Sequence, residues 1–256
     1  MKSNTRFKKA MLFVVALFLM CAFASAGAFA ADSGINTKPT LAELRNAYNL
    51  IGASPKGQAA TYTTDVNTDA YTPAKLTEAA LAYANSYINF MRYQAGLGGT
   101  SLDDTLNANA AQGALIMARN NVFSHDQAVP TGITEEAAKP GRYATMASNI
   151  SYSSAGPSSD NMSIIQNAIL GQMKDDSGSN LTTVGHRRWL LRPSTSTFGI
   201  GSALLSADGQ GWNTAYTCVR VMNRPYDTLY DEYLGQSSRT IQQIMIFIPG
   251  RLPVTC

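Results

Sequence analysis

Two histidines are the residues of this chain best suited to chemistry. The 256-residue sequence contains two of them, His125 and His186. His125 lies in the segment 122–126 (VFSHD), at the end of a predicted helix, and His186 lies in 185–189 (GHRRW), at the start of another element. A single histidine is more often a structural residue than a ligand. Because both stand beside polar groups at element boundaries, we predict that the fold brings the two imidazoles to one site.

The elements that must position this site follow a simple order along the chain. Helical spacing of apolar residues predicts helices over 72–96, 102–120 and 163–174, the first beginning at Thr72-Pro73 as an N-cap followed by proline. Residues 127–159 are rich in Pro, Gly, Ser and Thr and indicate loops, and strands are predicted over 198–205 and 212–221. Helices first and strands late favour an α+β fold over alternating βαβ units.

The N-terminal 30 residues have the pattern of a secretory signal. Four basic residues precede an apolar run over 11–24, and Ala28-Phe-Ala30 matches the small-residue pattern read by signal peptidase. The run is shorter than the roughly 20 residues of a membrane span. We therefore expect a signal peptide at 1–30 and a secreted, extracellular mature chain without a transmembrane anchor. Residues 31–71 are expected to form a linker or arm with one short helix over 41–51.

Charge and cysteine content exclude several classes of protein. The chain has 20 Lys and Arg against 17 Asp and Glu. Four of the basic residues lie in the signal, so the mature chain carries 16 against 17 and shows no basic patch that would indicate nucleic acid. Cys218 and Cys256 remain after cleavage, which allows one disulfide but is too few for a disulfide scaffold.

Three groups of residues carry a resemblance to a known family. The first group consists of Leu102-Asp-Asp-Thr-Leu106, the small residues of 110–114 and Phe123-Ser-His125. The second group is the segment 85–97, which contains Asn89-Phe-Met-Arg92. The third is 183–193 (TVGHRRWLLRP), followed by Gly199-Ile-Gly201. Their order and spacing over 72–221 resemble the CAP superfamily (cysteine-rich secretory, antigen 5 and pathogenesis-related proteins), in its secreted bacterial SCP-like branch.

The resemblance implies a three-layer α-β-α sandwich with a central antiparallel sheet. It also implies a cleft where two histidines and two acidic residues converge, which in some members binds a divalent metal. Imidazole nitrogen and carboxylate oxygen are both good zinc ligands. His125 and His186 match the histidines, and Asp175, with Asp176 as a rival, matches one acid. Zinc or another divalent metal held by His125, His186 and Asp175 is one expectation; a hydrogen-bonded structural cluster is the other.

One position departs from the family pattern. Ala147-Ser-Asn149 occupies the place where the family usually has Gly-Glu-Asn, so Ser148 stands where the first acid is expected, with Asn149 beside it in the predicted cleft. A hydroxyl at that position removes charge compensation for a dication and a candidate general base.

Two function classes are open from the sequence. The first is a secreted binding or interaction module whose cleft holds a small ligand (lipid, sterol or peptide), a cell-surface component or a metal. The second is a secreted, protease-like hydrolase with His125 or His186 as base. We favour binding, because the acid set is incomplete and no nucleophile lies beside a recognisable activating group.

The family pattern stops before the C-terminus. Related chains continue with an aromatic strand, a Trp-Pro pair and a glycine, which 239–256 lacks. Codons permitted for 244–256, read in another frame from the last base of Gln243, give NYDFYSWPAAGNL, which restores that order. We therefore predict that 222–256 is an atypical tail produced by a reading-frame shift after about Val221. The alternative is a genuine divergent C-terminus.

Overall fold

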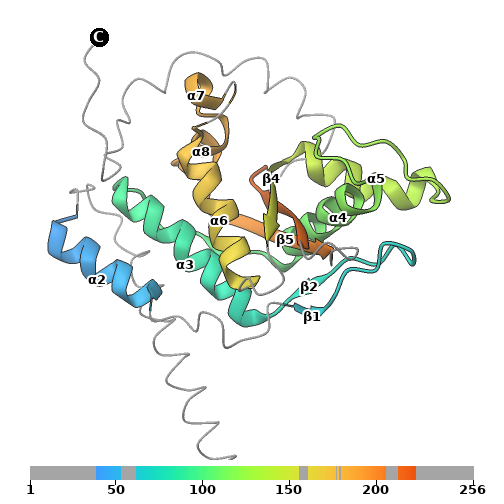
Figure 1. Ribbon diagram of the computed structural model, residues 1–256. Coiled ribbons are helices and arrows are strands. Elements are labelled where there is room, and N and C mark those ends of the chain that lie inside the picture. Colours follow the sequence, from blue (N-terminus) through green and yellow to red (C-terminus); the bar gives the residue numbers. More distant parts are fainter. Residues whose placement is uncertain are drawn as a thin grey trace, which may run out of the picture.

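The computed structural model describes residues 39–52, 62–155, 161–176, 178, 180–205 and 213–222 (Figure 1). Helices and strands alternate irregularly along the chain. In chain order they are α2 (Leu41–Gly52), β1 (Tyr62–Thr64), β2 (Lys75–Leu76), α3 (Glu78–Gln94), β3 (Ser101–Leu102), α4 (Asp104–Asn120), α5 (Glu135–Met146), β4 (Ser148–Ala155), α6 (Asn161–Lys174), α7 (Asn180–Thr183), α8 (Gly185–Leu190), β5 (Thr197–Leu205) and β6 (Asn213–Arg220).

A four-stranded sheet in the order β3-β5-β6-β4 forms the centre of the fold. Strands β5, β6 and β4 pair antiparallel, while the two-residue β3 pairs parallel with β5 at one edge. The strands predicted over 198–205 and 212–221 are confirmed as β5 and β6. Their alternating side chains serve two separate cores, because successive residues of a strand point to opposite faces.

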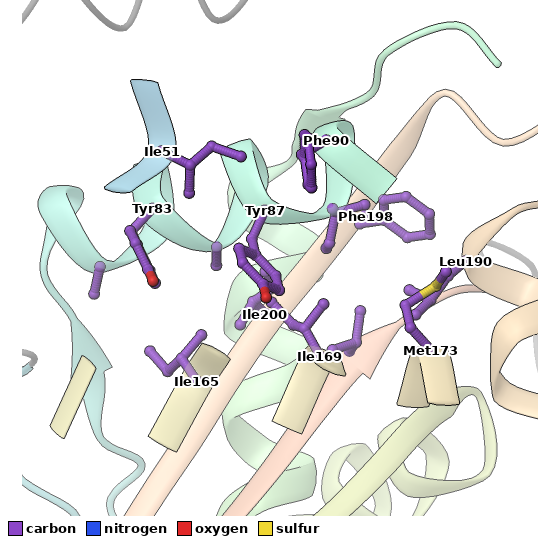
Figure 2. Packing of buried hydrophobic residues seen from close by; sticks show 14 of the residues in the cluster. Ile51, Tyr83, Tyr87, Phe90, Ile165, Ile169, Met173, Leu190, Phe198 and Ile200 are labelled. Carbon is purple, nitrogen blue, oxygen red and sulfur yellow. The ribbon is translucent and has the colours of Figure 1, made fainter. Parts of the chain in front are cut away.

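One face of the sheet packs on α3 and α6 and the other on α4. Phe198, Ile200 and Val219 belong to the core with α3 and α6, whereas Ala203, Tyr216 and Cys218 belong to the core with α4. Figure 2 shows side chains of α3 directed toward those of α6 and toward β5. Helices on both faces of a mainly antiparallel sheet make the three-layer α-β-α sandwich that the resemblance implied.

The first helix of the domain starts later than predicted. Thr77, and not Thr72, is the N-cap of α3, and its hydroxyl accepts a hydrogen bond from Ala80 N at 3.1 Å. Residues 75–76 are extended instead, because they pair with β1 in a small antiparallel sheet. A tertiary pairing therefore overrides the local Thr-Pro signal. The predictions of helices near 102–120 and 163–174 are confirmed as α4 and α6.

The segment 127–159, predicted as loops, contains a helix and a strand. Helix α5 begins with the Thr134 hydroxyl accepting from Ala137 N, and Glu135 and Glu136 occupy its first turn, where acidic side chains are favourable. Pro140 lies inside this helix. Strand β4 pairs with β6 along its eight residues. The loop prediction was wrong for β4, because pairing with the distant strand β6 stabilises a strand of mostly small, polar residues.

The N-terminal arm is packed where the structure describes it. Helix α2 agrees with the helix predicted over 41–51, and it buries Ala47 and Ile51 in the core that contains α3. The hydroxyl of Tyr62, from β1, donates to Ser202 Oγ at 3.0 Å. Within the described ranges, no helix combines the length and apolarity that crossing a bilayer requires. The predicted signal peptide and residues 223–256 of the predicted tail lie outside the described residues.

Candidate functional site

His186 and Asp175 form a close pair at the end of α6. The Nδ1 atom of His186 lies 2.7 Å from Asp175 Oδ1, and the Asp175 side chain is fully buried. Asp175 takes a left-handed backbone conformation (φ 46°) directly after α6, which turns the chain away from the helix axis. Of the two acidic residues that the sequence offers for this site, Asp175 is the one within hydrogen-bonding distance of the His186 imidazole. Asp176 is exposed.

Arg187 fixes the position of this pair. Its backbone N–H donates to Asp175 Oδ2 at 2.7 Å, and its guanidinium donates to the carbonyl oxygens of Met173 and Lys174. These carbonyls belong to the last turn of α6, which has no helical partners for them and carries the negative end of the helix dipole. Arg187 therefore attaches α8 to the end of α6 and places His186 beside the carboxylate.

Asn180 packs against the same imidazole. Its Nδ2 atom lies 3.2 Å from His186 Nδ1. A Cβ at Gly185 would lie 2.8 Å from Asn180 Oδ1, so a side chain at this position would force the Asn180 amide to shift. An ionised carboxylate is a stronger acceptor than a neutral group. We therefore assign the Nδ1 proton to the bond with Asp175, which leaves Nε2 of His186 as an unprotonated nitrogen in the neutral ring.

Asn149 links β4 to the histidine segment. Its side chain is buried, and its Nδ2 donates to the backbone oxygen of His186 at 2.9 Å. The predicted cleft residue Asn149 therefore lies with His186 and Asp175, where it acts on the backbone of α8.

His125 is held at the other side of the α5–β4 junction. Its Nδ1 lies 2.7 Å from the backbone oxygen of Thr145, and the Thr145 hydroxyl donates to the His125 oxygen at 2.8 Å. The residue is exposed. Thr145 and Asn149 stand four residues apart, so both histidine segments are attached to one short stretch of chain. No hydrogen bond or ion pair joins His125 to His186 or Asp175 in the described part of the chain.

Ser148 is buried but makes no contact with the His186 pair. Asn149 and Ser148 are successive strand residues, so their side chains leave opposite faces of β4. Ser148 pairs in register with Arg220 of β6, and its hydroxyl has no nitrogen or oxygen partner. The structure therefore places Asn149, Asp175 and His186 together, with His125 and Ser148 attached to neighbouring positions.

The donor atoms fit a metal only in part. The described residues include no group of three His, Cys, Asp or Glu side chains arranged to hold an ion. Both oxygens of Asp175 are already used, one by His186 and one by Arg187. However, each imidazole has its Nδ1 held by an oxygen, and metal-ligating histidines are typically oriented in this way. Asp175 is thus suited to orient a ligand histidine, while direct coordination would require it to lose a present partner.

Arg92 is a positioning residue that sequence reasoning did not identify. The side chain is buried, with 1% of its surface exposed, and donates to the backbone oxygens of Gly98, Leu190, Arg192 and Thr195. Burial lowers the pKa of its guanidinium to about 10, so it stays charged at neutral pH. Arg92 joins α3 to the end of α8. The sequence signal was an arginine among apolar residues of a predicted core helix.

A known family and two solved structures are similar to this chain. The family model described as the cysteine-rich secretory protein (CAP) family matches residues 86–219, just over half of the chain. An outer surface protein from Borrelia burgdorferi is similar in structure, with 16% identity over 57% of this chain and 96% of that protein, and a TM-score of 0.32.

A second solved structure belongs to an extracellular protein containing an SCP domain from Bacillus anthracis str. Ames. It is 20% identical, with 54% of this chain and 40% of that protein covered and a TM-score of 0.30. No curated protein matches the chain. The family match runs from the middle of α3 through most of β6 and includes the segments that hold His125, Asp175 and His186. The chain is therefore a member of the CAP family of cysteine-rich secretory proteins.

Proposed function

We propose that this protein is an exported binding module that takes a small ligand or a divalent metal in a cleft at His186 and His125. The observation that carries the proposal is the buried Asp175 carboxylate on His186 Nδ1. This bond orients the ring and presents Nε2, and among the described residues no hydrogen bond engages that atom. A partly buried, oriented imidazole with one nitrogen left available is suited to recognition.

The anchoring of both histidines supports a shared cleft. His125 is attached to Thr145 at the end of α5, and the His186 backbone is attached to Asn149 at the start of β4, so the two anchors lie within five consecutive residues. His125 Nδ1 faces a carbonyl oxygen, so its Nε2 is also left available. A bound divalent metal would supply a Lewis acid or a charged anchor for a ligand. His125 and His186 would then hold it through Nε2, and Asp175 would orient His186.

Export is part of the same proposal. The signal pattern of 1–30 predicts a mature chain that starts near Ala31, and the two structural relatives are described as an outer surface and an extracellular protein. Partners of the cleft would then be a small lipid, sterol or peptide, or a component of the cell surface. N-terminal sequencing of material recovered outside the cytoplasmic membrane tests this part, and a chain there that begins at Met1 would contradict it.

The test of the cleft compares two neighbouring carboxylates. Zinc binding to chelator-treated protein is measured by calorimetry for the wild type, His186→Ala, His125→Ala, Asp175→Asn and Asp176→Asn. Loss of an orienting partner typically costs 10- to 100-fold in metal affinity, about the loss expected for Asp175→Asn. The exposed Asp176→Asn should bind as the wild type does. Equal zinc binding by the wild type and both histidine variants would contradict the metal form of the proposal.

A hydrolase remains the second candidate, because an aspartate-oriented histidine supplies two of the three members of a catalytic triad. No described Ser, Thr or Cys side chain hydrogen-bonds to the His186 ring. Binding is therefore the better-supported function. Time-dependent turnover of peptide or ester substrates that disappears in His186→Ala would favour the hydrolase instead.

A further inference from the structure

Arg220 is a buried cation that has no acidic partner among the described residues. Only 2% of the residue is exposed. Its guanidinium lies over the Tyr143 ring, 4.6 Å from the centroid, and one terminal nitrogen makes a long hydrogen bond of 3.4 Å to the Tyr143 backbone oxygen. Its Nε has no hydrogen-bond partner, and no carboxylate of the described residues forms an ion pair with it. Buried charges are normally paired, because losing water is costly.

Ser148 lies directly opposite Arg220 and is also unsatisfied. The two residues are partners in the β4–β6 register, so their side chains leave the same face of the sheet about 4.5–5.5 Å apart at Cβ. The Ser148 hydroxyl is buried, has no nitrogen or oxygen partner, and lies near the thiol of Cys218, which is a weak hydrogen-bonding group. The Nε–H of Arg220 and the hydroxyl of Ser148 are thus two neighbouring donors without a nitrogen or oxygen acceptor among the described residues.

We propose that Arg220 and Ser148 form a binding site for a small carboxylate. The guanidinium Nε–H and the serine hydroxyl would each donate to one oxygen of a planar carboxylate, and the positive charge of Arg220 would be neutralised. Guanidinium groups favour this geometry because their donors lie in one plane. Both residues are more than nine-tenths buried, so the ligand would have to be a small acid such as formate or acetate.

This site is separate from the His186 pair. Ser148 and Arg220 face α4 and α5, whereas Asn149 leads to His186 on the opposite face of β4. The carboxylate proposal therefore does not depend on the function proposed for the histidines. Asp175→Asn, which removes the carboxylate that orients His186, should leave binding at Arg220 unchanged and so separates failure of one proposal from failure of the other.

The test observes Arg220 directly. The Nε–H resonance of Arg220, assigned with Arg220→Lys, is followed by NMR in the full chain during titration with formate, acetate or chloride at constant ionic strength. We expect a saturable shift with the two carboxylates and a weaker, non-saturating change with chloride. Removing one hydrogen-bond donor in Ser148→Ala should weaken carboxylate binding about tenfold.

Ser148→Glu supplies the carboxylate from the chain itself. If this variant folds, its Arg220 resonance should be shifted before any titration and should not respond to acetate. Should it fail to fold, Ser148→Ala alone decides the matter, since it only removes one oxygen. Absence of a saturable shift in the wild type, or equal carboxylate affinity in the wild type and Ser148→Ala, would overturn the proposal.

Discussion

The chemistry of the His186 imidazole is set by residues that do not face a ligand. Asp175 holds Nδ1, the Arg187 backbone occupies the other carboxylate oxygen, and Asn149 holds the His186 carbonyl. Each contact fixes one degree of freedom of the ring or of α8. A site of this kind is sensitive to small changes in the supporting residues, because the orientation of the imidazole depends on all of them.

Replacing Asp175 by asparagine should destabilise the protein measurably. The change keeps the shape but exchanges a carboxylate that accepts two hydrogen bonds for an amide that can accept only at its oxygen. Leaving buried donors poorly paired costs about 1–3 kcal/mol. Urea unfolding of Asp175→Asn and Asp176→Asn provides the comparison, with the exposed Asp176 variant within about 0.5 kcal/mol of the wild type. Equal losses in both variants would contradict the assigned role of the buried carboxylate.

Cys218 gives a prediction of pH dependence. Burial raises the pKa of its thiol from 9.0 to about 12, an effect that the nearby Arg220 charge reduces. Because the folded pKa lies above the unfolded one, the thiol stabilises the fold fully below about pH 9, and this contribution is lost as the pH rises toward 12.

Unfolding free energies measured at several pH values test this loss of stability. The difference in unfolding free energy between the wild type and Cys218→Ala should shrink as the pH is raised from 8 to 10.5. Peptide mapping after iodoacetamide treatment at pH 8.5 should find Cys218 unmodified in the folded protein and modified in urea. Rapid alkylation of the folded protein at Cys218 would contradict the burial of this thiol.

Elements were predictable where local signals and tertiary packing agree. The helices α4 and α6 and the strands β5 and β6 have apolar periodicities that match the faces they bury. The predicted start of α3 at Thr72 was wrong, because residues just after it pair with β1 instead of forming a helix. The elements α5 and β4 were not predicted, because their compositions resemble those of loops. Asp175 was identified through its resemblance to a family position. The roles of Arg187 and Arg92 depend on carbonyl groups distant in sequence, which no local pattern specifies.

The close packing of β5 on α4 depends on a glycine. A Cβ at Gly201 would lie 2.1 Å from Ala111 N and 2.3 Å from Ala110 C, both backbone atoms of α4. Neither can move without displacing the helix from the sheet. Gly171 in α6 offers the opposite case, because it is exposed and a Cβ there would meet nothing within 4 Å.

Two alanine substitutions should therefore act in opposite directions. Gly201→Ala should lower the unfolding free energy by about 3 kcal/mol, at the upper end of ordinary overpacking. Gly171→Ala should raise it by about 0.5–1 kcal/mol, because alanine loses less backbone entropy in a helix than glycine does. Both are measured by chemical denaturation. A Gly201→Ala protein as stable as the wild type would show that α4 and β5 lie farther apart than described.

At the scale of the whole molecule, the arm before the sandwich is part of the packing. The prediction from composition placed the domain start at Thr72, yet α2 contributes Ala47 and Ile51 to the core with α3, and β1 pairs with β2. Tyr48 of α2 also contacts the Phe90 ring, with centroids 5.7 Å apart. Arg92 ties the other end of α3 to α8. Helix α3 therefore contacts both the N-terminal arm, through α2, and helix α8, which carries His186.

Removing the arm tests this connection. A chain that begins at Thr72 should be less stable than one that begins at Ala31 by about 3 kcal/mol, since it exposes the apolar surface that Ile51, Ala47 and β1 cover. The loss should appear as a lower melting temperature by calorimetry. A matched chain in which Leu41, which is 63% exposed, is replaced by serine controls for effects of the arm's sequence and should melt as the full arm does. Equal melting temperatures for the chains starting at Thr72 and Ala31 would show that the arm does not stabilise the fold and that the domain begins at Thr72.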